Sequence, residues 1–391
     1  MDLTRKHKII LHFSTCCERS GMLLKRTPLF MTILTVLVWG YASANTTPSA
    51  DFDGDGVVGI PDFLIFVEQF GSSRGDGTYQ AKYDLDGNGV IGIPDFLIFV
   101  DSFGKEVPSQ TVVVPVCDRT SAVRDSIVAL APVSTCGDVT EVHLSAIDSL
   151  SLSGARLTAL KAGDLSGLTG LTKLSMQENR LSSLPDGFFD DLNALTSINV
   201  SFNRLTTSIP SELFALSDLT YLDLRGNRLV GEIPSALGNL SNLEELYLWN
   251  NRLVGEIPSA LGNLSNLMVL SLSNNQLDGE IPPELGNLSN LTVLSLWGNR
   301  LGGEIPPELG NLSNLRILDI ERNRLGGEIP PELGNLSNLT QLWLNNNQLE
   351  GAIPTALGSL SNLTALYLYS NQLEGAIPTA LGSLSNLTAL Y

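Results

Sequence analysis

Two acidic segments near the N-terminus combine the residue types and the spacing that a calcium ion needs. Residues 51–62 and 84–95 each place an oxygen-bearing side chain at loop positions 1, 3, 5 and 12 and a glycine at position 6. Side chains at alternate positions, with the carbonyl group of position 7, can converge on one ion, and calcium takes about six to eight oxygen ligands. The spacing therefore predicts two Ca²⁺ sites. The expected ligands are Asp51, Asp53, Asp55, Val57 and Asp62 in the first loop and Asp84, Asp86, Asn88, Val90 and Asp95 in the second.

The other residues that could do chemistry do not predict an enzyme. Of three histidines, His7 and His12 lie in a leader that would be removed, and His143 lies in an apolar stretch that we interpret as a strand. The sequence contains no glycine-rich phosphate loop. The best candidate acids are Asp319 and Glu321, which could approach the separation of glycosidase carboxylates. On an open sheet we expect nothing to bury these acids or shift their pKa, so we expect no catalytic activity.

The charge of the chain excludes anionic partners. The 391 residues contain 41 Asp and Glu against 23 Lys and Arg, which gives a formal net charge of −18. Binding to phosphates requires clustered lysine and arginine side chains. We therefore expect no nucleic-acid partner and no binding to an anionic membrane surface.

The first 44 residues have the order of a signal peptide. A basic pair precedes an apolar run over 29–40, and small residues at 42–44 permit cleavage before Asn45. An apolar run of about 12 residues is shorter than the roughly 20 that span a bilayer, so we expect no stable membrane span. The sequence thus predicts a secreted or cell-surface protein with its leader at 1–44 and with Met22 as an alternative start.

Two cysteines remain once the leader is removed, and the segment around them predicts a cap. Cys117 and Cys136 should form a disulfide in an oxidising compartment. Apolar residues between them fall at helical spacing, which predicts a short amphipathic helix. A solenoid must shield its first unit, so we expect residues 117–146 to cover the repeats that follow. The segment 105–116, which contains two prolines, is expected to be an extended linker.

Each acidic loop leads into a nearly identical apolar segment, residues 63–70 and 96–103, which we expect to form a helix. No helix is expected before either loop, and position 12 is aspartate rather than glutamate. This repeated loop and helix resembles the dockerin module of bacterial extracellular complexes. The resemblance implies a small, mainly helical calcium module at 45–104, a cohesin-like scaffold as its partner, and a bacterial source. The residues implied in docking occupy loop positions 10 and 11 and are Ile60, Pro61, Ile93 and Pro94.

A 24-residue period governs the rest of the chain. The frame Leu-x-x-Leu-x-Leu-x-x-Asn-x-Leu recurs in each unit, and its asparagines are Asn179, Asn203, Asn227, Asn251, Asn275, Asn299, Asn323, Asn347 and Asn371. This frame resembles the leucine-rich repeat, and the Gly-x-Ile-Pro continuation, as at 231–234, resembles the plant-type subclass of receptor ectodomains. The resemblance implies an α/β right-handed solenoid, or horseshoe, with a parallel concave sheet and about ten repeats over 147–391. We expect the asparagine amides to bond backbone groups of adjacent coils, and the chain to be truncated within a repeat at Tyr391.

Residues that alternate with the inward leucines should point out of the concave sheet. The three tryptophans outside the leader and four tyrosines occupy such positions, and exposed aromatic side chains mark recognition surfaces. Segments 279–291, 303–315 and 327–339 are identical, whereas the outward residues between them differ, which favours diversification for binding. The expected ligand-binding residues are Tyr221, Asp223, Arg225, Tyr247, Trp249, Trp297, Asp319, Glu321, Trp343, Tyr367 and Tyr369.

These features together predict a calcium-stabilised extracellular binding protein. Its concave face would recognise a protein, a peptide or a polysaccharide, because flat aromatic side chains suit peptides and sugar rings equally. Its N-terminal module would dock the protein to a partner. The alternative is that the chain is the targeting and recognition part of a larger extracellular enzyme or receptor with a further C-terminal domain.

Overall fold

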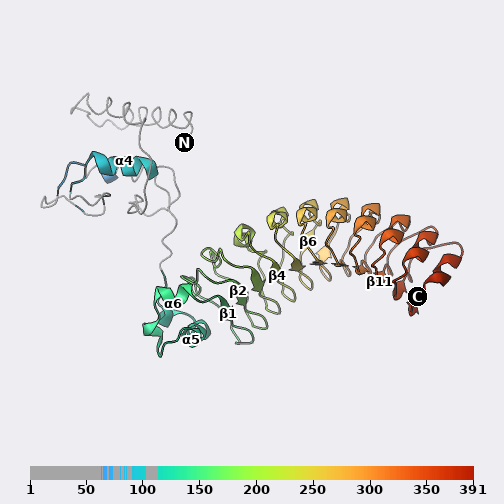
Figure 1. Cartoon of the computed structure of the whole chain (residues 1–391), viewed down its shortest axis with the longest axis horizontal. Helices are drawn as coiled ribbons and strands as arrows, with labels where there is room; N and C mark the ends of the chain where they lie inside the picture. Colours follow the sequence, from blue (N-terminus) through green and yellow to red (C-terminus); the bar gives the residue numbers. More distant parts are fainter. Residues whose placement is uncertain are drawn as a thin grey trace, which may run out of the picture. The chain divides into compact units, whose positions relative to one another are not determined.

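The computed structural model describes residues 113–391 continuously and, nearer the N-terminus, residues 63, 65–67, 70–73, 80, 83, 85 and 90–102. The chain divides into two compact units, Met1–Ser109 and Gln110–Tyr391. The second unit carries the repeats, and Figure 1 shows its coils stacked one after another from β1 to the C-terminus.

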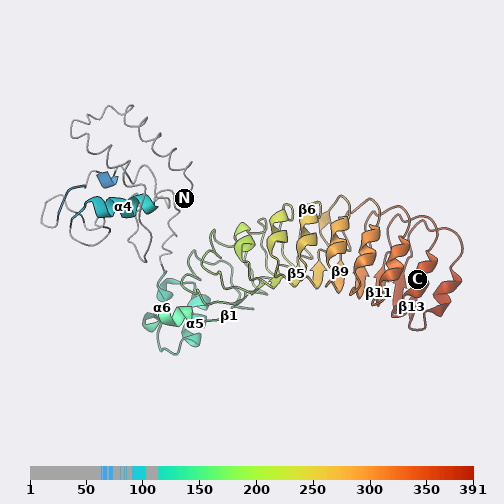
Figure 2. The same cartoon turned by 45° about the horizontal axis from the view of Figure 1, so that its top comes forward.

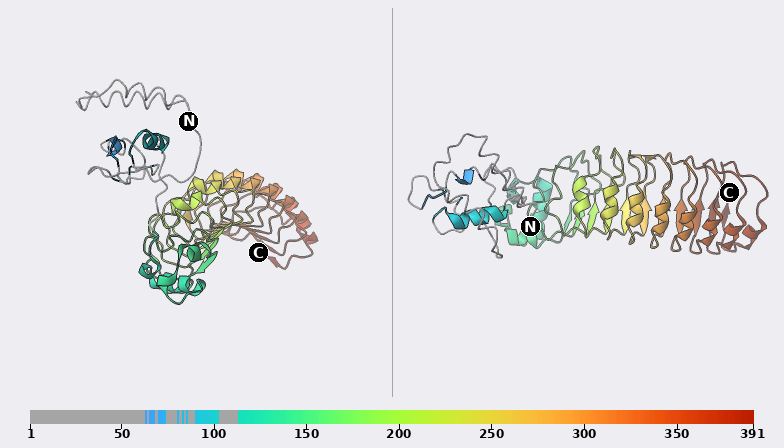
Figure 3. Two further views of the ribbon diagram at one scale, coloured as in Figure 1. Left: turned by 60° about the vertical axis from the view of Figure 1, so that its left-hand side comes forward. Right: turned by 90° about the horizontal axis from the view of Figure 1, so that it is seen from above.

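Each coil of the second unit contributes one short strand to a parallel sheet of eleven strands within residues 113–391. Consecutive strands pair in register with partners 24 residues apart, as Leu222 does with Leu246. Figures 1, 2 and 3 show these strands on the inner side of a curved stack and short helices on its outer side. The strands are β1 (Ser149–Ser151), β2 (Lys173–Ser175), β3 (Ser197–Asn199), β4 (Tyr221–Asp223), β5 (Glu245–Tyr247), β7 (Val269–Ser271), β9 (Val293–Ser295), β10 (Ile317–Asp319), β11 (Gln341–Trp343), β12 (Ala365–Tyr367) and β13 (Ala389–Leu390).

Each strand of the large sheet from β4 onward is preceded, on the outer side of its coil, by a short 3₁₀-helix that begins directly after a proline. Pro234, for example, is the N-cap of one such helix and has a φ of −67°, which lies in the range that the proline ring enforces. The helices are η5 (Ser211–Ala215), η6 (Ser235–Asn239), η7 (Ser259–Asn263), η8 (Pro283–Asn287), η9 (Pro307–Asn311), η10 (Pro331–Asn335), η11 (Thr355–Ser359) and η12 (Thr379–Ser383). A second, two-stranded sheet pairs β6 (Val254–Gly255) with β8 (Gln276–Leu277).

The core of the second unit is a continuous column of leucine and isoleucine side chains. In the coil that contains β4, the seven inward apolar side chains are each 2% exposed or less. Burying one such side chain contributes about 2 kcal/mol, but only the adjacent coils can bury it. Those residues are Leu219, Leu222, Leu224, Leu229, Ile233, Leu237 and Leu240.

The asparagine column bonds each coil to the coil before it, which confirms the ladder expected from the repeat. In Asn275, Oδ1 accepts a hydrogen bond from the backbone N–H of Leu253 at 3.0 Å. Its Nδ2 donates to the carbonyl oxygens of Leu248 and Leu272, each at 3.0 Å. Because the first two partners lie in the preceding coil, the amide ties two coils together.

The N-terminal end of the repeats is covered by α5 (Ser121–Leu130), with η3 (Val116–Asp118), η4 (Cys136–Asp138) and α6 (Glu141–Ser145) beside it. A disulfide joins Cys117 to Cys136 across this region. Val123 and Ile127 on α5 are fully buried and join the same core as the leucines of the repeats. The predicted amphipathic helix is therefore present, although its last residue, Leu130, is 50% exposed.

Two parts of the cap differ from the expectations. His143 lies on α6 rather than on a strand, because Thr140 and His143 form a capping box that begins a helix. The end of the expected linker packs on the first coil, where the N–H of Val114 donates to Ser166 Oγ at 2.9 Å and Val116 is buried. The Arg119 guanidinium fixes this contact by donating to the carbonyl oxygens of Asp164 and Ser166.

The described part of the first unit centres on α4 (Ile93–Ser102), which begins three residues before the expected helix. The rings of Phe66 and Phe99 stack with centroids 5.4 Å apart, and Ile91 is fully buried beside Phe66. Ser73 and Val90 form an antiparallel bridge. None of the described helices has the length and apolar character needed to cross a lipid bilayer.

Candidate ligand-binding face

The outward side chains of the strands form the concave face, and all eleven predicted ligand-binding residues lie on it. The aromatic side chains among them are partly exposed, and Tyr369 reaches 45% exposure. Asp223 and Asp319 are buried, at 0% and 3% exposure, so the expectation that these acids face solvent is wrong. Both are short side chains flanked on each side by a neighbour one strand away, which covers them.

Six residues near β4 form an arginine cluster. Its centre is Arg225, whose Nη2 lies 2.9 Å from Asp223 Oδ2 and whose side chain is 29% exposed. The Arg225 Cζ atom lies 4.9 Å from the ring centroid of Tyr247 and 5.8 Å from that of Trp249. This enclosure by π faces stabilises the guanidinium charge and holds it in place. The members of the cluster are Phe202, Tyr221, Asp223, Arg225, Tyr247 and Trp249.

The two tyrosines of the arginine cluster act as neutral hydrogen-bond donors. Tyr221 donates to Asp223 Oδ2 at 3.1 Å, and Tyr247 donates to Glu245 Oε2 at 2.7 Å. Burial, reinforced by Asp223, raises the pKa of Tyr221 to about 12. Burial, followed by the hydrogen bond to Glu245, also raises the pKa of Tyr247. Both phenols therefore stay protonated at neutral pH.

Phe202 is part of the arginine cluster although the alternation of the strands does not predict it. It follows β3 and directly precedes Asn203, with a φ of +53°. Its ring lies 6.0 Å from that of Trp249 and 5.9 Å from the Arg225 Cζ atom. The residue before the column asparagine repeatedly has positive φ in this protein, so an aromatic residue at that position is the signal that could have identified it.

Four residues on and just after β10 and β11 form an acidic cluster, namely Asp319, Glu321, Trp343 and Asn345. Asp319 Oδ2 accepts from Ser295 Oγ at 3.3 Å, and Asp319 Oδ1 accepts from the backbone N–H of Glu321 at 3.4 Å. Asn345 Nδ2 donates to Glu321 Oε2. Burial, with the charge of Glu321 adding to it, raises the pKa of Asp319 to about 7. The expectation that nothing would bury these acids or shift their pKa is therefore wrong for Asp319.

Aromatic side chains continue from the acidic cluster toward the C-terminal coil. The rings of Trp343 and Tyr367 meet edge to face at 6.1 Å, and Tyr367 stacks on Tyr391 at 4.9 Å. The buried Nε1 of Trp343 has no hydrogen-bond partner among the described residues. Trp297 lies half-buried on a coil between the two clusters. The concave face thus presents rings along most of its length.

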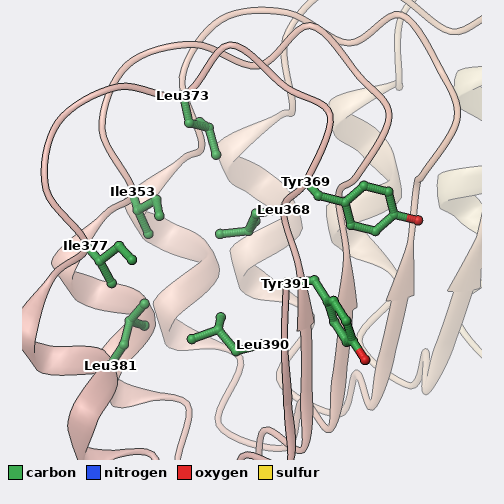
Figure 4. A pocket seen from close by; sticks show the side chains of 8 residues that line it. All are labelled: Ile353, Leu368, Tyr369, Leu373, Ile377, Leu381, Leu390 and Tyr391. Carbon is green, nitrogen blue, oxygen red and sulfur yellow. The ribbon is translucent and has the colours of Figure 1, made fainter.

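An apolar pocket of about 240 Å³ opens at the last coils. Figure 4 shows the side chains that line it. Leu390 is 49% exposed there, whereas its equivalent one coil earlier, Leu366, is fully buried. The pocket is therefore lined mainly by core positions of the repeat, together with Tyr369 and Tyr391 from the row of aromatic side chains. Its lining residues are Ile353, Leu368, Tyr369, Leu373, Ile377, Leu381, Leu390 and Tyr391.

Most of the expected calcium and docking residues lie outside the described residues. These are Asp51, Asp53, Asp55, Val57, Asp62, Asp84, Asp86 and Asn88, together with Ile60 and Pro61. Asp95 is fully buried in the first turn of α4, and its Oδ2 accepts from the N–H of Gly92 at 2.7 Å. Val90 and Ile93 are 48% and 45% exposed. Within the described residues, no group of three His, Cys, Asp or Glu side chains is placed to hold a metal ion.

Comparison with protein families identifies the repeats. The family described as a leucine-rich repeat region matches residues 201–325 and 282–391, and a second leucine-rich repeat family matches residues 169–229. Together these matches span residues 169–391, which is more than half of the chain. No curated protein matches the sequence.

Several solved structures resemble the repeats. A TDR receptor has 36% identity and a TM-score of 0.62, and the match covers 64% of this chain and 44% of that one. The Arabidopsis receptor kinase HAESA ectodomain, solved in complex with an IDA peptide hormone ligand that is extended at its N-terminus, has 34% identity and a TM-score of 0.58 over 62% of this chain and 45% of that one. This chain thus spans less than half of the length of these two receptors.

A leucine-rich repeat protein of Leptospira interrogans has 30% identity and a TM-score of 0.52, with 64% of this chain and 67% of that chain covered. The expected bacterial source gains no support from the receptor matches, since HAESA is a plant protein. The repeat frame, the parallel sheet, the family matches and these structures agree on one assignment. The chain belongs to the leucine-rich repeat family.

Proposed function

We propose that the repeats form an extracellular domain that binds an extended peptide on the concave face. The observation that carries this proposal is the row of partly exposed aromatic side chains with a half-buried arginine held among them. Such rings offer a large contact area at a low cost in side-chain entropy. Strands lie about 4.8 Å apart and an extended peptide advances about 3.3 Å per residue, so successive coils can contact successive parts of one peptide.

The charges beside the rings favour a peptide over a polysaccharide. Arg225 and Glu321 are both partly exposed, at 29% and 23%, and stand within the row of aromatic side chains. Charged groups on a ligand give such side chains partners that a neutral sugar lacks. The HAESA ectodomain, which holds a peptide hormone, supports the same choice. The disulfide between Cys117 and Cys136 suits an extracellular location, since such bonds persist in oxidising compartments.

A peptide display library screened against the secreted protein tests this proposal. We expect peptides that bind with a Kd of about 1 µM, and we expect Trp249→Ala to weaken them by about 30-fold because a central aromatic side chain is lost. The matched control is Glu308→Gln on η9, an exposed position on the outer side, which should leave binding unchanged. Peptides that bind Trp249→Ala and Trp343→Ala as tightly as the unaltered protein would contradict a concave site.

We also propose that two calcium ions stabilise the first unit through the loops at 51–62 and 84–95. The buried carboxylate of Asp95 at the start of α4 supports this, because it occupies loop position 12 and fits the ligand that closes a calcium shell. Calcium would offset the repulsion among the loop carboxylates and would fix the loops that lead into the helices.

Calorimetric titration of the full chain with Ca²⁺ tests this second proposal. We expect about two ions bound per chain at millimolar calcium, as in extracellular calcium modules, and a gain in helicity that a chelator reverses. Asp51→Ala combined with Asp84→Ala should abolish both effects, since each replaces the ligand at loop position 1. Glu106→Gln, outside both loops, is the control. An unchanged calcium response in the double variant would rule out these sites.

For the first unit we propose docking to a cohesin-like scaffold through Ile60, Pro61, Ile93 and Pro94. The exposure of Ile93 and Pro94 at the start of α4 supports this role. A second candidate function is recognition within a larger receptor, which the similarity to receptor ectodomains favours. In either case the concave face remains the site at which the ligand is recognised.

A further inference from the structure

Asp319 occupies the same place in its coil as Asp223, four coils earlier, but its local partner is different. The sequence around β4 is Tyr-Leu-Asp-Leu-Arg over 221–225, and that around β10 is Ile-Leu-Asp-Ile-Glu over 317–321. Each aspartate is buried in the concave face. The residue two positions later is Arg225 in the first case and Glu321 in the second.

This difference leaves Asp319 without the cation that Asp223 has. Asp223 is paired with the Arg225 guanidinium at 2.9 Å. Asp319 accepts hydrogen bonds from Ser295 Oγ and from the N–H of Glu321, and no described lysine or arginine pairs with it. Burial of a carboxylate without a cation is unfavourable. Burial raises the pKa of both carboxyl groups, and for Asp319 the charge of Glu321 adds to it and the pKa reaches about 7.

A buried acceptor without a described partner lies in the same cluster as Asp319. Asn345 is 0% exposed, and its buried Oδ1 has no hydrogen-bond partner among the described residues. Its Nδ2 donates to Glu321, so the free acceptor lies close to that carboxylate. Arg322 Nε lies 3.8 Å from Glu321 Oε1, and the Arg322 side chain is 63% exposed. The two carboxylates and Asn345 Oδ1 thus supply more acceptors than the described donors that reach them, while Trp343 Nε1 is a buried donor of the same cluster without a described partner.

We propose that Asp319, Glu321 and Asn345 form a subsite for an arginine side chain of the bound peptide. The ligand would supply to this coil the guanidinium that Arg225 supplies within its own coil. A planar guanidinium suits the subsite because it can donate to several oxygens at once, and the neighbouring ring of Trp343 can contact its face. This inference rests on the proposed function and defines one feature of the ligand.

The test uses the full chain and a small probe, Nα-acetyl-arginine methylamide. A probe of this size is expected to bind with a Kd of about 1 mM. NMR would follow the carboxyl carbon of Asp319 and the indole N–H of Trp343. The uncharged isostere Nα-acetyl-citrulline methylamide should bind at least about tenfold more weakly, because it lacks the positive charge.

Two variants locate the probe. Glu321→Arg recreates at β10 the pair that exists at β4, so we expect it to lower the pKa of Asp319 and to abolish binding of the arginine probe. Glu321→Gln changes no side-chain size and should weaken the probe severalfold, which keeps the test valid if the first variant folds poorly. Glu308→Gln on the outer side is the control and should bind the probe normally.

Three results would overturn the subsite: equal binding of the citrulline probe, unchanged binding in both Glu321 variants, or no shift at about 20 mM probe. Failure of the peptide proposal is distinguishable from these. The library could yield peptides that depend on Trp249, contain no basic residue and bind the Glu321→Arg variant normally. That result would support the peptide site and contradict the arginine subsite. If the arginine probe binds but no peptide is recovered from the library, the arginine subsite would be supported and the peptide proposal contradicted.

Discussion

Asn275→Ala is expected to lower the free energy of unfolding of the repeats by about 3 kcal/mol. The alanine removes the only acceptor described for the buried N–H of Leu253. The carbonyl oxygens of Leu248 and Leu272 lose one donor each but keep the amides of Asn251 and Asn299. The Ser273 carbonyl oxygen also loses a donor but keeps the N–H of Asn250. The loss is therefore one orphaned donor and three weakened acceptors rather than a set of unsatisfied groups, which limits its size.

Denaturant unfolding measures this effect, and hydrogen exchange at Leu253 locates it. The matched control is Asn287→Ala at the end of η8, where the side chain is exposed and the expected change is within about 0.5 kcal/mol. Because each coil is stabilised by its neighbours, the substitution should lower the stability of the coils on both sides of the substituted one. Equal stability of the Asn275 and Asn287 variants would show that the column is not what joins the coils.

The fold of the repeats could be predicted from the sequence because every coil carries the same apolar side chains to bury and the same asparagine amide to pair. Leu222 and its equivalents have no place to be buried except against the next coil, and Asn227 and its equivalents have backbone partners only in the stack. The cap could be predicted less well. The helix around Val123 follows from apolar spacing. The short helix α6, which contains His143, instead depends on the capping box between Thr140 and His143.

The chemistry of the concave face could be predicted only in part. The alternation along a strand identifies which side chains point outward, but it gives no information about their contacts with side chains of the neighbouring strands. The burial of Asp319 depends on Ser295 and Trp343 in the strands beside it, which are 24 residues away in sequence. The enclosure of Arg225 depends on Phe202, which reaches the face through a left-handed backbone conformation rather than through a strand. Both effects arise between coils.

Gly286→Ala is expected to destabilise the repeats by about 3 kcal/mol or more, because the added methyl group would meet backbone atoms. A Cβ at this position would lie 2.4 Å from the carbonyl oxygen of Glu308 and 2.8 Å from its carbonyl carbon. Those atoms belong to η9 of the next coil, so the clash cannot be relieved by rotating a side chain. The coils would have to separate on their outer side, which would open the leucine core between them.

Gly302→Ala is the control for this prediction, since a Cβ there meets nothing within 4 Å and the backbone does not have positive φ. That variant should be neutral or gain about 0.5 kcal/mol, because alanine restricts the unfolded chain. The two variants add the same methyl group to the same solenoid, so their difference in unfolding free energy measures the close contact of adjacent coils alone. A Gly286 variant as stable as the Gly302 variant would mean that the stack tolerates wider spacing on its outer side.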